Sequence, residues 1–141
     1  MQDQLGHVGL RVELQAMDWG TMLSRMAKRE PVEQGGWSCF CTTWAGLSVA
    51  TPGSSYPLRG NGTGGWNGWP SDPAIEALRQ QWFDAPDTGA AQAICRQVQE
   101  AAFASLPFVP LGQWSGPAAY RGNVTGLLRS PFMLFWNARK A

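Results

Sequence analysis

Charged side chains are scarce in this sequence, and neither sign dominates. Asp, Glu, Lys and Arg make up 15% of the 141 residues, and 11 basic against 10 acidic residues leave a formal net charge of +1. Nucleic-acid binding through a basic surface is excluded, because there is no surplus of cations to displace counterions. Intrinsic disorder is also excluded, because the hydrophobic fraction of 44% is close to that of globular domains.

Histidine and cysteine are too few for two common kinds of site. His7 is the single histidine, so neither a Ser-His-acid set nor a four-ligand zinc site can be assembled. No pair of carboxylates has the spacing of paired catalytic acids, and we expect no enzymatic activity and no metal site. Cys39, Cys41 and Cys95 are expected to be free, partly buried thiols, the alternative being a disulfide from Cys95 to one of the other two.

Long apolar runs are missing too. The densest, residues 132–136, has the length of a strand and falls short of the roughly 18 residues that cross a bilayer. Residues 1–7 are polar and lack the basic and apolar regions of a signal peptide, which taken alone predicts a cytoplasmic protein. Residues 3–9, however, resemble the last turn of a helix, so we expect the chain to be a piece of something longer.

A βαβ unit is predicted near the N-terminus. Apolar and polar residues alternate strictly over residues 8–16, which predicts a strand, and Asp18 offers the N-cap of a following helix. Residues 37–44 are rich in aromatic and β-branched residues and are predicted to form a second, parallel strand. The expected class is therefore α/β, with ligands at the carboxyl ends of the strands.

The second half of the sequence predicts a helix hairpin after a long loop. Residues 45–71 have no hydrophobic period, and their aromatic residues favour an ordered loop. Asp72 and Pro73 mark the start of one helix, and a second runs over about 89–105, so that the pair covers one face of the sheet. The Gly-rich run at 60–65 fits a dinucleotide fingerprint literally, but it lacks the flanking strand and helix, and no cofactor is expected.

Eight tryptophans are the most informative feature of the composition. Trp19 and Trp82 occur at helical core spacing and are expected to be buried. Trp37 and Trp44 flank the second predicted strand, and Trp66 lies in the Gly-rich loop. Exposed indoles suit peptides, sugars and aromatic ligands, whereas the alternative for each is that it covers the sheet.

These residues resemble the C-terminal lobe of extracytoplasmic solute-binding proteins of the peptide/nickel type, solute-binding family 5, which serve ABC importers. The resemblance covers nearly the whole chain and depends on the order of several short motifs more than on any single one. The motifs are Val12-Glu13-Leu14-Gln15-Ala16-Met17-Asp18-Trp19, Gly35-Gly36-Trp37, Thr42-Thr43-Trp44-Ala45-Gly46, Gly68-Trp69-Pro70-Ser71-Asp72-Pro73, Phe108-Val109-Pro110-Leu111-Gly112 and Phe135-Trp136-Asn137-Ala138-Arg139.

The resemblance implies a periplasmic-binding-protein-like lobe from a longer, two-lobed protein. Residues 1–111 would be the second lobe, incomplete at its N-terminal side, and 112–141 would return to pack on an absent first lobe. It also implies a periplasmic or other extracytoplasmic location and importer membrane subunits as partners. Many peptide-binding members have an acidic residue after the equivalent of Trp44, where this chain has Ala45 to Val49, so recognition of a free amino terminus is not expected.

The leading hypothesis is a non-enzymatic solute-binding lobe that supplies one wall of a ligand cleft. The alternatives are a free-standing aromatic-platform module for carbohydrates or peptides, and a small α/β domain whose tryptophans are all core. Self-association through Phe132–Trp136 is expected, because an exposed strand edge invites pairing. The expected ligand contacts are Trp37, Phe40, Thr42, Thr43, Trp44, Tyr56 and Trp66.

Overall fold

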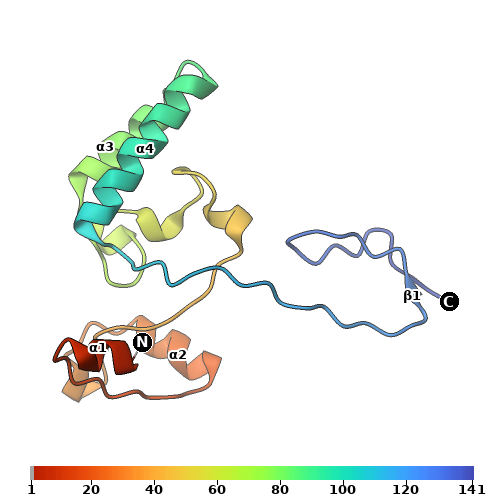
Figure 1. The fold of residues 1–141 in the computed structure, drawn as a ribbon, viewed down its shortest axis with the longest axis horizontal. Coiled ribbons are helices and arrows are strands. Elements are labelled where there is room, and N and C mark those ends of the chain that lie inside the picture. Colours follow the sequence, from red (N-terminus) through yellow and green to blue (C-terminus); the bar gives the residue numbers. More distant parts are fainter. Residues whose placement is uncertain (1) are drawn as a thin grey trace. The chain divides into compact units, whose positions relative to one another are not determined.

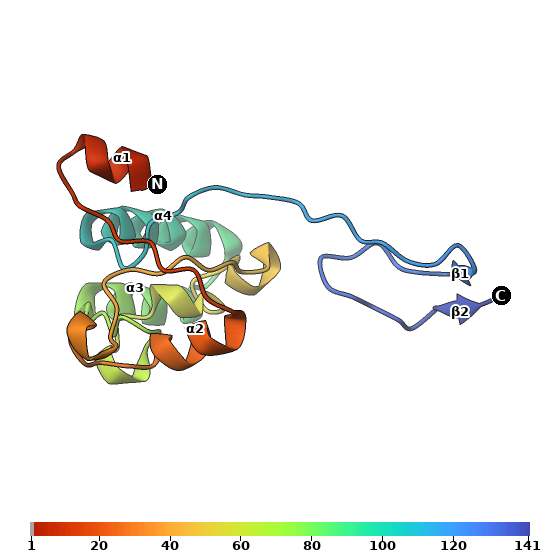
Figure 2. The same cartoon turned by 90° about the horizontal axis from the view of Figure 1, so that it is seen from below.

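The computed structural model describes residues 2–141, which divide into two compact units with the boundary in the sequence between Thr42 and Thr43. The elements along the chain are drawn in Figure 1 and, turned by 90°, in Figure 2. Helices dominate: α1 (Gln2–His7), α2 (Trp19–Met26), α3 (Pro73–Phe83) and α4 (Thr88–Ser105). The strands of the described residues are β1 (Val124–Thr125) and β2 (Arg139–Lys140), which pair antiparallel. No helix in this part of the chain is long and apolar enough to span a membrane.

The first unit is organised by α2. Asp18 caps the helix, accepting hydrogen bonds from the backbone N–H and the hydroxyl of Thr21. Met26, at the other end of α2, is fully buried. Trp19 is exposed, so the prediction that it belongs to the core is wrong.

The predicted βαβ unit is absent from the described residues. Residues 10–18 and 39–45 have no strand pairing, and Val8 and Leu14 of the first predicted strand are 72% and 71% exposed. Alternation of apolar and polar residues gives a strand only where a neighbour accepts the backbone hydrogen bonds and a second layer covers the apolar face. Neither is supplied by residues 2–141, and the α/β class is corrected to a mostly helical structure with one small antiparallel sheet.

A tight turn joins α2 to the second predicted strand. The short 3₁₀ helix η1 (Val32–Gln34) ends at Gly35, whose φ of 92° is left-handed. Both Arg25 Nε and Nη2 donate to the carbonyl of Gly36, at 3.0 and 2.8 Å. The indole N–H of Trp37 donates to the carbonyl of Met26 at 3.1 Å. These bonds fix the start of the following segment to the C-terminal end of α2.

The second unit is built on the predicted helix hairpin, which is confirmed. Helices α3 and α4 lie side by side in both views (Figures 1 and 2). Asp72 and Asp87 are their N-caps, and Pro73 occupies the first helical position of α3. All these signals are local in sequence, which is why the helices could be predicted within a few residues.

The core of the hairpin is small. Ile75 and Val98 are its fully buried hydrophobic side chains, and Trp82 is half-buried against Phe83, with ring centroids 5.2 Å apart. The prediction that Trp82 belongs to the core is thus met in part. Much of the hairpin's remaining apolar surface is open to solvent.

The long loop before α3 is ordered by three further 3₁₀ turns: η2 (Gly46–Val49), η3 (Tyr56–Leu58) and η4 (Gly62–Gly64). Its end is closed by hydrogen bonds from Gly62 N to Pro70 O and from Asp72 N to Gly60 O, at 2.9 and 2.8 Å. Gly53 lies so close to Trp82 that a Cβ there would be 2.8 Å from the indole ring. The expected ordered, packed loop is confirmed.

Candidate functional site

An aromatic cluster lies in the loop of the second unit. The Trp44 and Trp66 ring centroids are 4.9 Å apart and those of Tyr56 and Trp66 are 5.6 Å apart, both pairs edge to face. The Tyr56 hydroxyl donates to the carbonyl of Gly65 at 3.2 Å, which joins two turns of the loop. Trp44 and Tyr56 are 39% and 41% exposed, whereas Trp66 is half-buried between them. The cluster thus offers solvent an apolar surface edged with polar groups.

The sequence around the cluster is almost without charge. Arg59 is the single charged residue between Trp37 and Ser71. Its guanidinium is engaged by Glu76 of α3, with Nε 3.0 Å from Oε1 and Nη2 3.1 Å from Oε2. The cluster is therefore suited to uncharged groups of a ligand and not to a free ammonium or carboxylate.

Glu76 fastens the loop to α3. Besides the two bonds from Arg59, Oε1 accepts the backbone N–H of Gly60 at 2.8 Å. Partial burial by itself raises the pKa of Glu76, but the hydrogen bonds from Arg59 and Gly60 and the charges of Arg59 and Arg79 outweigh it, and the pKa is lowered. The carboxylate is thus held ionised where the loop meets the helix.

Arg79 makes a second attachment one turn further along α3. Its Nη1 donates to the carbonyl of Pro52 at 2.9 Å, and the side chain is buried. Its Nε lies 3.8 Å from Glu76 Oε1 and has no hydrogen-bond partner. Burial, together with the charge of Arg59, lowers the pKa of Arg79, while Glu76 acts in the opposite direction. Glu76 and Arg79 hold the loop segments on both sides of Tyr56.

The remaining predicted ligand contacts fall on both sides of the unit boundary. Trp37 and Phe40, in the first unit, pack edge to face with centroids 4.7 Å apart. Thr42 is half-buried at the end of that unit, and Thr43 is exposed at the start of the next. The structure therefore brings Trp44, Tyr56 and Trp66 together, and it pairs Trp37 with Phe40 separately.

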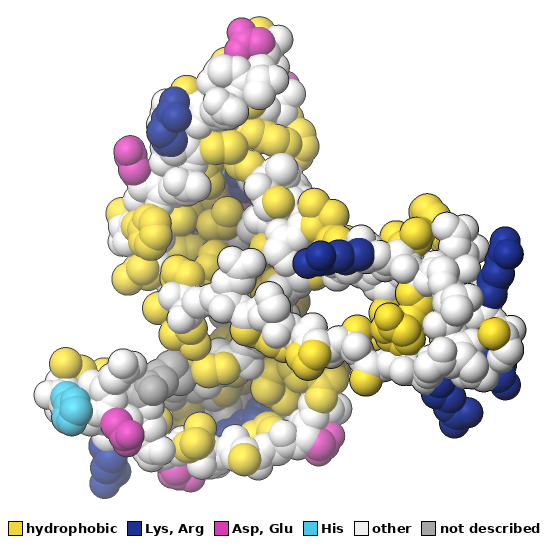
Figure 3. Space-filling model, turned by 45° about the vertical axis from the view of Figure 1, so that its right-hand side comes forward, with side chains coloured by type: hydrophobic (Ala, Val, Ile, Leu, Met, Phe, Trp, Pro, Cys, Tyr) yellow, Lys and Arg dark blue, Asp and Glu magenta, His cyan; other side chains and the backbone are white. Residues whose placement is uncertain are grey.

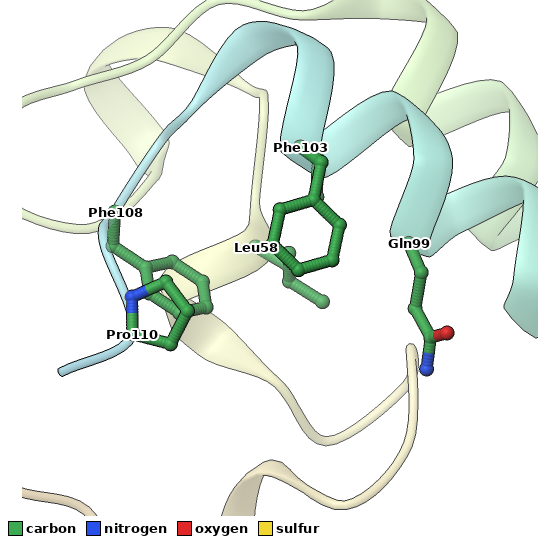
Figure 4. A pocket seen from close by; sticks show the side chains of 6 residues that line it. Leu58, Gln99, Phe103, Phe108 and Pro110 are labelled. Carbon is green, nitrogen blue, oxygen red and sulfur yellow. The ribbon is translucent and has the colours of Figure 1, made fainter. Parts of the chain in front are cut away.

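An apolar cavity at the C-terminal end of α4 was not predicted from the sequence. It has a volume of about 350 Å³ and is lined by Phe103, Phe108, Leu58 and Pro110, with Gln99 at one side (Figure 4). Figure 3 shows hydrophobic side chains gathered on the surface of the part with α3 and α4, with few charges among them. Phe103 is 67% exposed. A large apolar side chain outside the buried stripe of an amphipathic helix was the sequence signal that could have revealed this surface.

Residues 2–141 contain no group of three or more His, Cys, Asp or Glu side chains that could hold a metal ion. The two pKa shifts described above belong to groups that fasten the loop. What the site provides is a preformed apolar contact surface, which suits binding.

Comparison with known proteins finds one clear relative. No protein-family model matches the chain. Over 138 residues, 98% of the chain, it is 37% identical to a probable peptide ABC transporter periplasmic-binding protein of Sinorhizobium fredii, and it spans 26% of that protein's length. The name of that relative describes a binding component of a transporter. The resemblance found in the sequence is thereby confirmed: the chain is homologous to a segment of a solute-binding protein of an ABC transporter.

Proposed function

We propose that this chain forms one wall of the ligand cleft of a solute-binding protein, which in its complete form delivers a peptide or similar small solute to the membrane subunits of an ABC importer. Residues 1–111 would belong to the second lobe and 112–141 to the segment that returns to the first. The similarity to a probable periplasmic-binding protein supports a periplasmic place of action.

The observation on which this proposal depends is the Trp44–Tyr56–Trp66 cluster. Its two outer rings are half open to solvent, and Glu76 and Arg79 hold its loop on α3. Preformed aromatic surface with few polar groups is typical of small-molecule sites. The shortage of charge favours an uncharged part of the solute, such as an apolar side chain, as the group that meets this wall.

A single wall binds weakly, because the contacts and the exclusion of water supplied by the second wall are missing. We expect the isolated chain to bind the dipeptide Ala-Phe no more tightly than about 1 mM, which is about −4 kcal/mol. Its blocked, uncharged form should bind at least as well as the zwitterion.

NMR of the tryptophan indole N–H groups tests the proposal. Titration with blocked Ala-Phe should shift the signals of Trp44 and Trp66, and Trp44→Ala should abolish the shift of Trp66. Trp136→Ala is the matched control, because Trp136 is an exposed tryptophan of the tail outside the cluster. An unperturbed cluster would contradict the proposal, as would micromolar affinity, and selective binding of an oligosaccharide would favour the aromatic-platform module.

A further inference from the structure

Two thiols are exposed close together in sequence near the end of the first unit. Cys39 and Cys41 are both exposed, whereas Phe40 between them and Thr42 after them are half-buried. Residues 39–45 contain no helix, turn or bend. A segment without helix, turn or bend is extended, and in strand-like geometry neighbours at i and i+2 point to the same side. The alternation of exposed and half-buried residues from Cys39 to Thr42 agrees with that geometry.

The residue between the thiols is anchored on the opposite side. Phe40 packs edge to face on Trp37, at a centroid distance of 4.7 Å, and the Trp37 indole is itself hydrogen-bonded to the carbonyl of Met26. The pair of thiols is therefore presented by a segment whose inner face is fixed to α2.

Distances in an extended segment favour an ion between the sulfurs over a bond between them. Residues at i and i+2 are about 6.6 Å apart along a strand. A disulfide requires Cβ atoms about 3.5–4.5 Å apart, so it cannot form here without moving the backbone. Two metal–sulfur bonds of about 2.3 Å each bring the sulfurs only to about 4.6 Å, which rotation of the two side chains can reach.

The number of ligands selects the ion. Zinc takes four ligands, and among residues 2–141 no third His, Cys, Asp or Glu joins the two thiols. Thiolates select soft ions, and Cu(I) accepts two of them in a linear arrangement. We propose that Cys39 and Cys41 form a two-thiolate binding site for a single Cu(I) ion. Binding releases the two thiol protons to solvent, so affinity increases with pH.

Competition with a colorimetric Cu(I) chelator tests the site on the full, reduced chain without oxygen. One ion should bind per chain. Loss of a residue that only supports a metal ligand typically lowers metal affinity by about 10–100-fold. Cys39→Ser and Cys41→Ser each remove a ligand itself, so each should lower the affinity for Cu(I) by at least that factor. Both positions are exposed, so serine should leave the circular dichroism unchanged. Cys95→Ser, which alters a half-buried thiol of α4, is the matched control and should bind as the wild type does.

Several results would overturn the proposal. These are failure of the wild type to take Cu(I) from the chelator, undiminished binding by the Cys39→Ser or the Cys41→Ser variant, and a stoichiometry of one ion per two chains. Loss of binding in Cys95→Ser would also overturn it, because it would place the ion on a different pair of thiols.

Discussion

Arg59 and Glu76 are 17 residues apart in sequence, yet two N–H groups of the guanidinium point at the two oxygens of the carboxylate, at 3.0 and 3.1 Å. The bidentate geometry is stronger and more specific than a single contact between charges. Because Arg59 adjoins the turn that carries Tyr56, this pair connects α3 to the aromatic cluster. The order of the candidate site therefore depends on Glu76, which lies outside the aromatic cluster.

Removal of the carboxylate should loosen the loop. Glu76→Ala deletes the acceptor for Arg59 and Gly60 and leaves the buried Arg79 without its nearest anion. We expect the free energy of unfolding in urea to fall by about 1–3 kcal/mol, the cost of leaving such groups unpaired. Glu100→Ala on the exposed side of α4 is the control and should change it by less than about 0.5 kcal/mol. Equal stability of the two variants would show that Glu76 does not fasten the loop.

The same pair predicts a dependence of stability on pH. The folded state lowers the pKa of Glu76 from 4.5, so the ionised carboxylate stabilises the fold above that value. As the pH falls below about 4.5, the Glu76 carboxylate becomes protonated in the unfolded chain before it does so in the folded one. This favours the unfolded chain, so the stabilisation is lost as the pH approaches the lower pKa of the folded state. Urea unfolding between pH 6 and pH 3 should show a smaller loss of stability for Glu76→Gln than for the wild type. Parallel curves would contradict this assignment.

The sequence predicted the features that depend on neighbouring residues and failed on those that depend on contacts between distant residues. Asp72, Pro73 and Asp87 act within one helical turn, so the start of each helix of the hairpin was recognisable. The strand pattern of residues 8–16 was misleading, because a strand also needs a partner, and the described residues do not provide one. The aromatic residues of the cluster were predicted individually, but their contacts required knowing how the loop folds. The Arg59–Glu76 pair was missed for the same reason.

The turn after α2 should not tolerate a side chain at Gly36. A Cβ there would overlap the carbonyl oxygen of Glu30, and moving the turn would break the two hydrogen bonds from Arg25. We expect Gly36→Ala to destabilise the first unit by about 1–3 kcal/mol or more, as overpacking does. Thermal unfolding followed by the NMR signal of the Trp37 indole N–H is the measurement. Gly122→Ala, where a Cβ would have no neighbour within 4 Å, is the control, and equal effects would contradict the expectation.

The tail should cause the chain to associate with itself. Met133 and Trp136 are 80% and 83% exposed, and Phe135 beside them is exposed as well. Burial of one such side chain is worth about 1.5–3 kcal/mol, so several in water form a strong association site. We expect the sedimentation coefficient of the intact chain to increase with concentration, and early proteolysis after Trp114. A chain ending at Trp114 keeps the α3–α4 hairpin with both of its caps, and it should sediment as a monomer. If the intact chain were monomeric and resistant to protease, the tail would have a partner within this chain, and the proposal that it returns to another lobe would be wrong.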